Sequence, residues 1–298
     1  MGAGQCGRHV AAAVCERATE GEIGARTVLV DSSQKPMRRT LDRLASALGI
    51  EPSTASRDHL VTFEARAGLG QTIFDDPASA TAAVASVADS IKETTADADA
   101  LLYALGLGGQ VGNSVVPRVI DRLSPPRDDP VTPEVGSRGN EGTSQLALGV
   151  WPFDHEAPRR HFDAVCGLSR LLQRDDGTPN ADMTLLASNA RLSEIGHVGN
   201  ARAVHPASEV GAGSKLYADE SAWINDVIAD AIRSVVGSAQ TPDDTTPETT
   251  SVTLPHRTDA RHGTVGVALE KPIELGLQHV IRRAVENAFV PLDPATVE

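Results

Sequence analysis

The sequence has 298 residues, with 27 basic and 40 acidic side chains and a formal net charge of −13 at pH 7. This excess of acidic residues argues against a nucleic-acid-binding or anionic-membrane-binding surface, because both ligands are negatively charged. The three cysteines have no metal-type spacing, so we expect neither a disulfide framework nor a structural zinc site. There is no signal peptide and no apolar run of membrane-spanning length, which predicts a cytoplasmic protein.

Lysine is rare in this chain. Only four of the 27 basic residues are lysines, and aromatic residues make up 3% of the sequence. This composition is typical of a salt-adapted, haloarchaeal-type protein, whose acidic surface repels itself in dilute buffer and is screened in concentrated salt. An ordinary acidic cytoplasmic protein is the alternative.

Predicted strands and helices alternate along residues 1–236. Such alternation, with glycine turns at the strand ends, predicts an α/β fold with a Rossmann-like parallel sheet and a ligand at the carboxyl ends of the strands. The expected strands are residues 26–31, 101–105, 146–150 and 182–187, and the expected helices are residues 8–20, 36–48, 78–94, 159–173 and 215–236.

Two polar, breaker-rich stretches divide the chain. Residues 124–144 are predicted to form a solvent-exposed insertion, and residues 237–254 a flexible linker. We therefore expect a nucleotide-binding domain over residues 1–236 and a small C-terminal α+β appendage over residues 255–298. The appendage is predicted to contain a strand at 264–268 and a helix at 275–289.

The most informative segment is a strand followed by the glycine-rich turn Gly106–Gly112 and a helix. Four glycines within seven residues let backbone N–H groups approach an anion, and the N-terminus of the next helix adds positive potential. We expect Pro117 in the first turn of that helix. A second loop of this kind, Gly2–Gly7, opens the chain, so the pattern predicts a phosphate-bearing ligand.

Two other interpretations of the first loop remain open. Gly2–Gly7 fits the G-x-G-x-x-G dinucleotide fingerprint, and Asp31 ends the next strand where a ribose-binding acid belongs, so an NAD-dependent dehydrogenase is one alternative. The other is that these glycines only permit tight turns between strand and helix.

Five motifs, in order over residues 2–236, resemble the tubulin/FtsZ family of GTP-binding cytoskeletal proteins. Residues 3–7 (AGQCG) resemble the first nucleotide loop of tubulin, and residues 105–117 resemble the phosphate signature of the family. Residues 151–160 (WPFDHEAPRR) are similar to the FtsZ segment K-P-F-x-x-E-G-x-x-R. Residues 188–192 (SNARL) resemble P-N-D-[RK]-L, and residues 218–220 (ADE) resemble the start of the central helix of FtsZ.

The resemblance implies GTP or GDP as the ligand and allows for Mg²⁺. It assigns the first loop to phosphate and base, Asp31 to the vicinity of the phosphates and metal, and Glu156 and Arg160 to the ribose. The guanine would be bound by Asn189 and Asp219, whose amide and carboxylate suit its polar edge. The complete set of implied nucleotide-binding residues is Gly4, Gln5, Cys6, Gly7, Asp31, Gly68, Gly70, Gly108, Gly109, Gln110, Gly112, Asn113, Glu156, Arg160, Asn189 and Asp219.

Several positions depart from the family pattern. Gln110, Val111 and Ser114 replace a glycine, the phosphate-bonding threonine and the final glycine of the signature. The catalytic loop N-x-D-x-x-D, due near residues 240–245, is not found, so no catalytic residue is predicted. We also expect no strand before the first loop, and a shortened second domain.

The sequence therefore predicts a guanine-nucleotide-binding cytoskeletal or cell-division protein with impaired hydrolysis. Such a protein could modulate filaments of full-length homologues. The alternatives are a weak GTPase that assembles by itself and the dehydrogenase.

Overall fold

The structure is a computed structural model that describes residues 1–20, 26–49, 60–62, 77–95, 98, 100–123, 143–174, 180–194, 220–240 and 261–264. Its strands are β1 (Gly2–Ala3), β2 (Leu29–Asp31), β3 (Leu60–Thr62), β4 (Ala100–Gly106), β5 (Ser144–Trp151), β6 (Met183–Ser188) and β7 (Arg261–Thr264). Its helices are α1 (Gly4–Glu20), α2 (Gln34–Leu48), α5 (Pro77–Thr94), α6 (Gln110–Leu123), α7 (Pro158–Leu172) and α9 (Glu220–Gln240).

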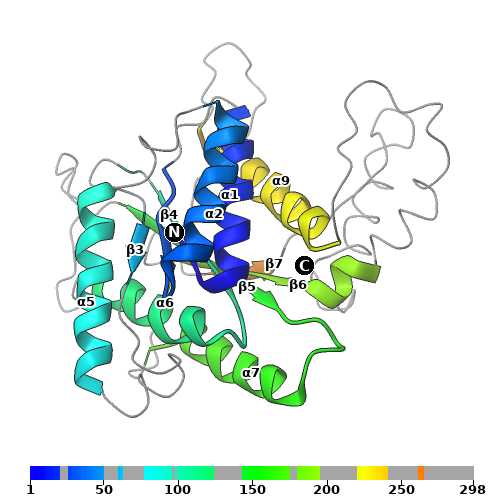
Figure 1. The fold of residues 1–298 in the computed structure, drawn as a ribbon. Coiled ribbons are helices and arrows are strands. Elements are labelled where there is room, and N and C mark those ends of the chain that lie inside the picture. Colours follow the sequence, from blue (N-terminus) through cyan, green and yellow to red (C-terminus); the bar gives the residue numbers. More distant parts are fainter. Residues whose placement is uncertain are drawn as a thin grey trace, which may run out of the picture.

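All seven strands form one parallel sheet in the order β3-β2-β1-β4-β5-β6-β7. The predicted α/β parallel sheet is thereby confirmed. The order of the strands reverses between β1 and β4, which lie side by side (Figure 1). In an open α/β sheet, such a reversal leaves a crevice at the carboxyl ends of the strands, where ligands bind.

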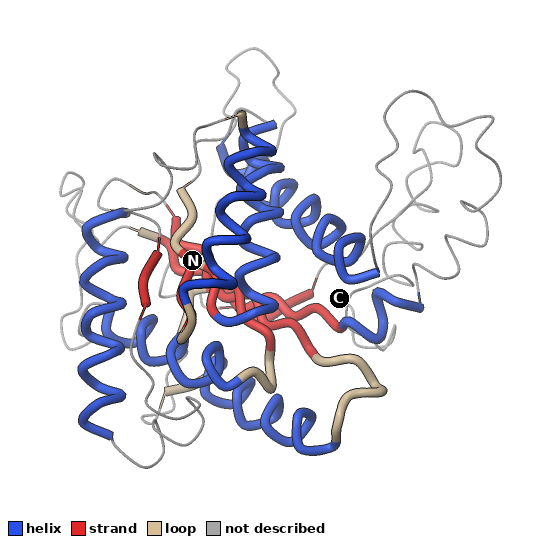
Figure 2. The backbone as a smooth tube through the Cα atoms, in the orientation of Figure 1, coloured by secondary structure: helices blue, strands red, loops and turns tan. Residues whose placement is uncertain are grey.

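Helices cover both faces of the sheet, as Figures 1 and 2 show: α5, α6 and α7 lie on one side, and α1, α2 and α9 on the other. Neighbouring residues of β4 accordingly enter different cores. Tyr103 and Leu105 pack with α5 and α6, whereas Ala104 packs with Val10 of α1 and Ile224 of α9. Because both faces are buried, β4 and β5 are nearly continuous apolar runs.

Several strand and helix boundaries in the structure differ from the expected ones. Residues 2–3, expected to lie in a loop, form the short strand β1 beside β4. The helix after the second glycine loop starts at Gln110, so Pro117 lies inside α6 and not in its first turn. Of the strand expected at 264–268, only Thr264 is described, and it ends β7 (Arg261–Thr264), which pairs with β6 at the edge of the same sheet.

Parts of the predicted domain division lie outside the described residues. Ser144, placed in the insertion, begins β5, and residues 237–240, placed in the linker, belong to α9. Residues 124–142, 241–254 and 265–298 are not among those described, so the division into three parts stays a prediction. None of the helices in the described ranges is both long and apolar enough to cross a membrane.

Candidate functional site

A cavity of about 1070 Å³ lies at the carboxyl ends of β1, β4 and β5, beside the reversal of strand order. It is large enough for a nucleotide. The predicted site residues that line it are Gly4, Gln5, Cys6, Asp31, Gly108, Gly109, Gln110, Gly112, Glu156, Arg160 and Asn189. Gly7 and Asn113 do not line it, and Gly68, Gly70 and Asp219 lie outside the described residues.

The two glycine loops form one wall of the cavity. Gly4 and Gly108 have φ values of 69° and 81°, in the left-handed region that favours glycine. The N–H of Gly109 donates to the carbonyl of Gly106 (3.1 Å), which closes the turn before α6 begins at Gln110. The N-terminus of α6 therefore opens onto the cavity.

Other helices also begin at this edge of the sheet, because each follows a parallel strand. The first residues of α1 (Gly4) and α6 (Gln110) line the cavity, as do Ala157 just before α7 and Ser221 near the start of α9. The first N–H groups of a helix have no partner within the helix, and its N-terminus carries partial positive charge. The cavity thus favours an anionic ligand.

Gly7 and Asn113 have packing roles instead. A Cβ at Gly7 would collide with the carbonyl of Ala104, so this glycine lets α1 lie directly on β4. The Asn113 side chain donates to the carbonyl of Asp163 (2.9 Å) and fills the space left by Gly167, which joins α6 to α7. In both cases the partner comes from a distant strand or helix, so the local motif alone did not reveal the contact.

In the part of the chain that the structure describes, three acidic side chains line the cavity, and each is paired with an arginine that also lines it. The closest atoms of these pairs are 2.6 Å apart for Arg8–Asp31, 2.8 Å for Arg160–Glu156 and 3.0 Å for Arg159–Asp163. The pairs differ in exposure: the first is buried, whereas the Arg159 side chain is 81% exposed.

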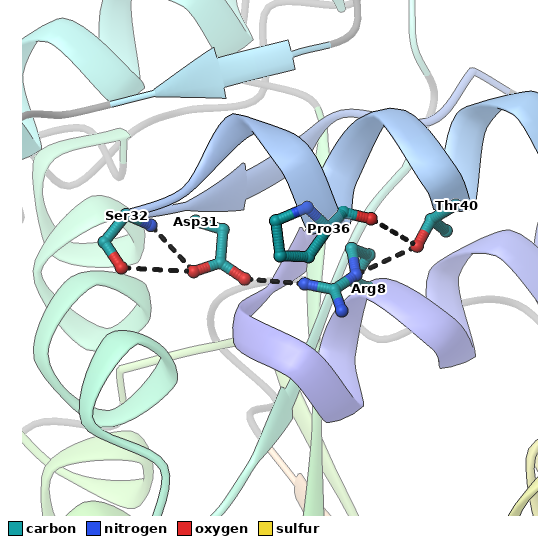
Figure 3. Close-up of polar contacts among 5 residues, drawn as sticks. All are labelled: Arg8, Asp31, Ser32, Pro36 and Thr40. Carbon is teal, nitrogen blue, oxygen red and sulfur yellow. Dashed lines mark hydrogen bonds and ion pairs between the residues drawn. The ribbon is translucent and has the colours of Figure 1, made fainter.

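The Arg8–Asp31 pair is part of a buried network (Figure 3). Arg8 donates through Nη1 to Asp31 and through Nε to the Thr40 hydroxyl (2.9 Å), which itself donates to the carbonyl of Pro36 (3.2 Å). The other Asp31 oxygen accepts the backbone N–H of Ser32 (2.7 Å). Burial lowers the pKa of Arg8, and the Asp31 carboxylate opposes that effect.

These contacts bear on the implied Mg²⁺. Magnesium in nucleotide sites prefers one or two protein carboxylates together with water and phosphate oxygens. Both oxygens of Asp31 already have partners, and so do both of Glu156, which binds Arg160 and accepts the N–H of Phe153 (3.0 Å). Within the described ranges, no three His, Cys, Asp or Glu side chains are grouped for a metal ion. The carboxylate oxygens of the described cavity wall therefore do not fit a magnesium site.

Cys6 is the one predicted site residue with a potential nucleophile. Burial raises the pKa of its thiol to about 12, and the nearby negative charge of Glu156 adds to this shift. The thiol is therefore protonated at neutral pH and lies in the wall of the cavity as a small, inert group.

Two amide side chains line the cavity from other elements. Asn189 follows β6 at the start of the helical residues 189–194, and Asn225 lies on α9, one turn after Ser221. Next to Asn225, Arg17 of α1 is paired with Asp226 (3.1 Å) and Asp230 (3.0 Å), which joins α9 to α1.

Sequence reasoning missed several lining residues. Arg8, His9, Arg43, Phe153, His155 and Asn225 all line the cavity and were not predicted to do so. Helical spacing offered a signal for Asn225, because residues four apart share a face and Ser221 follows the A-D-E motif directly. No comparable signal in the sequence marks Arg43.

No family model matches the sequence, and no curated protein matches it. The structure is similar to that of CetZ from Methanosaeta thermophila strain DSM 6194, with a TM-score of 0.63 over 98% of this chain and 69% of that chain. The two sequences are 15% identical in that superposition, so the likeness concerns the fold. This chain has a tubulin/FtsZ-like fold.

Proposed function

We propose that this chain is a guanine-nucleotide-binding protein of the cytoskeletal tubulin/FtsZ type, with impaired GTP hydrolysis. One observation carries the proposal: the cavity at the reversal of strand order has glycine loops and helix N-termini on one side and the amides of Asn189 and Asn225 on another. The first group suits phosphates and the second suits a base with a mixed donor and acceptor edge.

The likeness to CetZ favours this function over the dehydrogenase. It extends over 98% of the chain, whereas the dinucleotide fingerprint concerns only residues 2–7 and Asp31. Asp31 is also an unfavourable ribose ligand here, because Arg8 and Ser32 already hold its carboxylate oxygens.

Impaired hydrolysis is supported by the ion pairs that the acidic side chains of the cavity make with arginines. A general base must be free to accept a proton from the attacking water. Asp31, Glu156 and Asp163 are the carboxylates that line the cavity in the described part of the chain, and each is bound to an arginine. The protein's own residues would therefore bind and orient the nucleotide without activating water.

We place the protein in the cytoplasm as a modulator of filaments. Full-length homologues and a second copy of this chain are its two candidate partners. Self-assembly as a weak GTPase is the alternative, and turnover measurements distinguish the two.

Nucleotide titrations test the binding proposal. We expect the full-length protein in concentrated salt to bind GTP and GDP more tightly than ATP or NAD, as measured by calorimetry. Asn225→Ala should reduce the preference for guanine over adenine, because one amide partner of the base edge is lost.

Asn180→Ala is a poor control for this variant, because the Asn180 amide is buried against α6. Gln34→Ala, on the exposed surface of α2, is the better control. Tighter binding of NAD would contradict the proposal.

A further inference from the structure

Among the described residues, four arginines line the cavity: Arg8, Arg43, Arg159 and Arg160. Three of them are paired with the three acidic side chains that also line it, so those charges cancel in pairs. Arg43 makes no hydrogen bond or ion pair with another described residue. The unbalanced charge of the described cavity wall is therefore the positive charge of Arg43, in a protein whose formal net charge is −13.

The helix α2 directs this side chain toward the cavity. Pro36 and Arg43 are seven residues apart, two helical turns, and both line it, while Thr40 between them binds Arg8 (Figure 3). Side chains in a helix lean toward its N-terminus, and α2 begins just after β2 at the carboxyl edge of the sheet. The exposed Arg43 side chain can therefore reach along the helix toward a bound anion.

We infer that Arg43 is the specificity-determining residue for the charge of the phosphate chain. This inference rests on the proposed nucleotide function. The glycine loops and helix N-termini would bind phosphate in any nucleotide, whereas a free guanidinium makes a forked, charge-assisted contact that gains strength with each added negative charge. The site should accordingly favour a triphosphate over a monophosphate.

The experiment is a set of calorimetric titrations of the full chain with GTP, GDP, GMP and inorganic tripolyphosphate. The wild type should bind GTP more tightly than GMP. Arg43→Gln should weaken GTP and tripolyphosphate binding by about tenfold, the typical loss of one charge-assisted hydrogen bond, and should leave GMP binding unchanged. Arg43→Lys should restore part of the loss, since it keeps the charge and loses the fork.

Arg39→Gln is the matched control. Arg39 is an exposed arginine on the same helix that does not line the cavity, so its loss should leave all four affinities unchanged. An unchanged ratio of GTP to GMP affinity in Arg43→Gln overturns the inference, as does an equal effect of Arg39→Gln.

The titrations distinguish failure of the nucleotide proposal from failure of the inference about Arg43. If the wild type shows no preference for guanine but Arg43→Gln weakens tripolyphosphate binding, the nucleotide proposal fails and the role of Arg43 stands. If guanine is preferred and Arg43→Gln changes nothing, only the inference fails. If the wild type binds neither GTP nor tripolyphosphate, both are overturned.

Discussion

Gly108 packs directly against the backbone of Arg160, so that a Cβ at position 108 would collide with the Arg160 carbonyl oxygen. The φ of Gly108, 81°, is also one that other residues rarely adopt. The glycine loop after β4 and the first turn of α7 are thus fitted to each other, and this contact shapes the wall of the cavity before any ligand binds.

Gly108→Ala should destabilise the protein through both effects. We expect the free energy of unfolding to fall by about 2–4 kcal/mol, the sum of an unfavourable φ and a displaced backbone contact. Urea denaturation at constant high salt measures this loss. Gly49→Ala is the matched control, since Gly49 has a φ of 67° and open space around its Cα, so the change should cost only about 1–2 kcal/mol. Equal losses in the two variants would contradict the role of the Arg160 contact.

Removing one partner of the Arg8–Asp31 pair should be more costly than removing both. Asp31→Ala leaves a buried guanidinium without its carboxylate, and we expect the free energy of unfolding to fall by about 3–5 kcal/mol. The double variant Arg8→Met with Asp31→Leu should lose less, because no unpaired charge stays buried. The control is Arg159→Ala, whose exposed pair should contribute about 0–1 kcal/mol. A double variant as unstable as Asp31→Ala would count against this account.

Much of the fold could be predicted from the sequence because its signals are local. Continuous apolar runs, typical of buried strands, alternate with segments whose apolar residues have helical spacing, and glycine or proline marks the ends of these elements. The strands β4, β5 and β6 therefore lie close to their expected positions. The glycine loops were likewise visible, because no other residue type suits such turns. The start of α6 was placed wrongly because the rule that puts proline in the first turn is a preference, and Pro117 lies inside the helix.

The site could be predicted only in part, since its contacts join distant residues. Gly4 and Gly7 share one motif, yet Gly4 lines the cavity and Gly7 packs against Ala104, almost a hundred residues away. The pairing of Asp31 with Arg8 depends on how α1 packs against β2, which no local pattern specifies. The position of Asn225 depends in the same way on which face α9 turns to the sheet.

Nucleotide binding should not depend on a divalent cation. The oxygens of Asp31 and Glu156 are already bound within the protein, and arginine supplies the positive charge in the cavity. We expect equal affinities for GDP in excess EDTA and in excess MgCl₂, measured by calorimetry at one ionic strength. The comparison in EDTA with added NaCl separates metal from general salt effects. A much weaker affinity in EDTA would mean that a metal completes the site.

The Cys6 thiol should resist alkylation at mildly alkaline pH. Its pKa is raised from 9 to about 12 in the folded protein, so the reactive thiolate is scarce until the protein unfolds. The same shift makes stability fall as pH rises from about 9 to 12, because the unfolded chain loses this proton first. Cys6 and Cys166 are both partly exposed, so exposure alone does not separate them. Iodoacetamide labelling followed by peptide mass analysis should nevertheless modify Cys166 before Cys6, because the raised pKa keeps the Cys6 thiol protonated. Cys6→Ser should flatten the decline in stability above pH 9, and rapid labelling of Cys6 in the folded protein would contradict the prediction.

Hydrolysis and assembly are tested together by phosphate release and sedimentation. Acid–base assistance contributes about 10²–10⁴-fold to such a reaction, and the carboxylates that line the described cavity are all bound to arginine. The purified protein in concentrated salt should therefore release phosphate from GTP at a rate close to background and should not form long filaments.

A mixture with a full-length homologue from the same cell should behave differently. If the proposed function is right, the cavity of this chain could accept an acidic loop from the partner, so we expect the mixture to change the length or turnover of the partner's filaments. Asp243→Ala and Asp244→Ala are the decisive variants, because these are the acids nearest to where a catalytic loop was expected. If the protein alone shows GTP turnover that rises with its concentration and is lost in either variant, it carries a working catalytic loop of its own, and the assignment as a non-hydrolysing modulator is wrong.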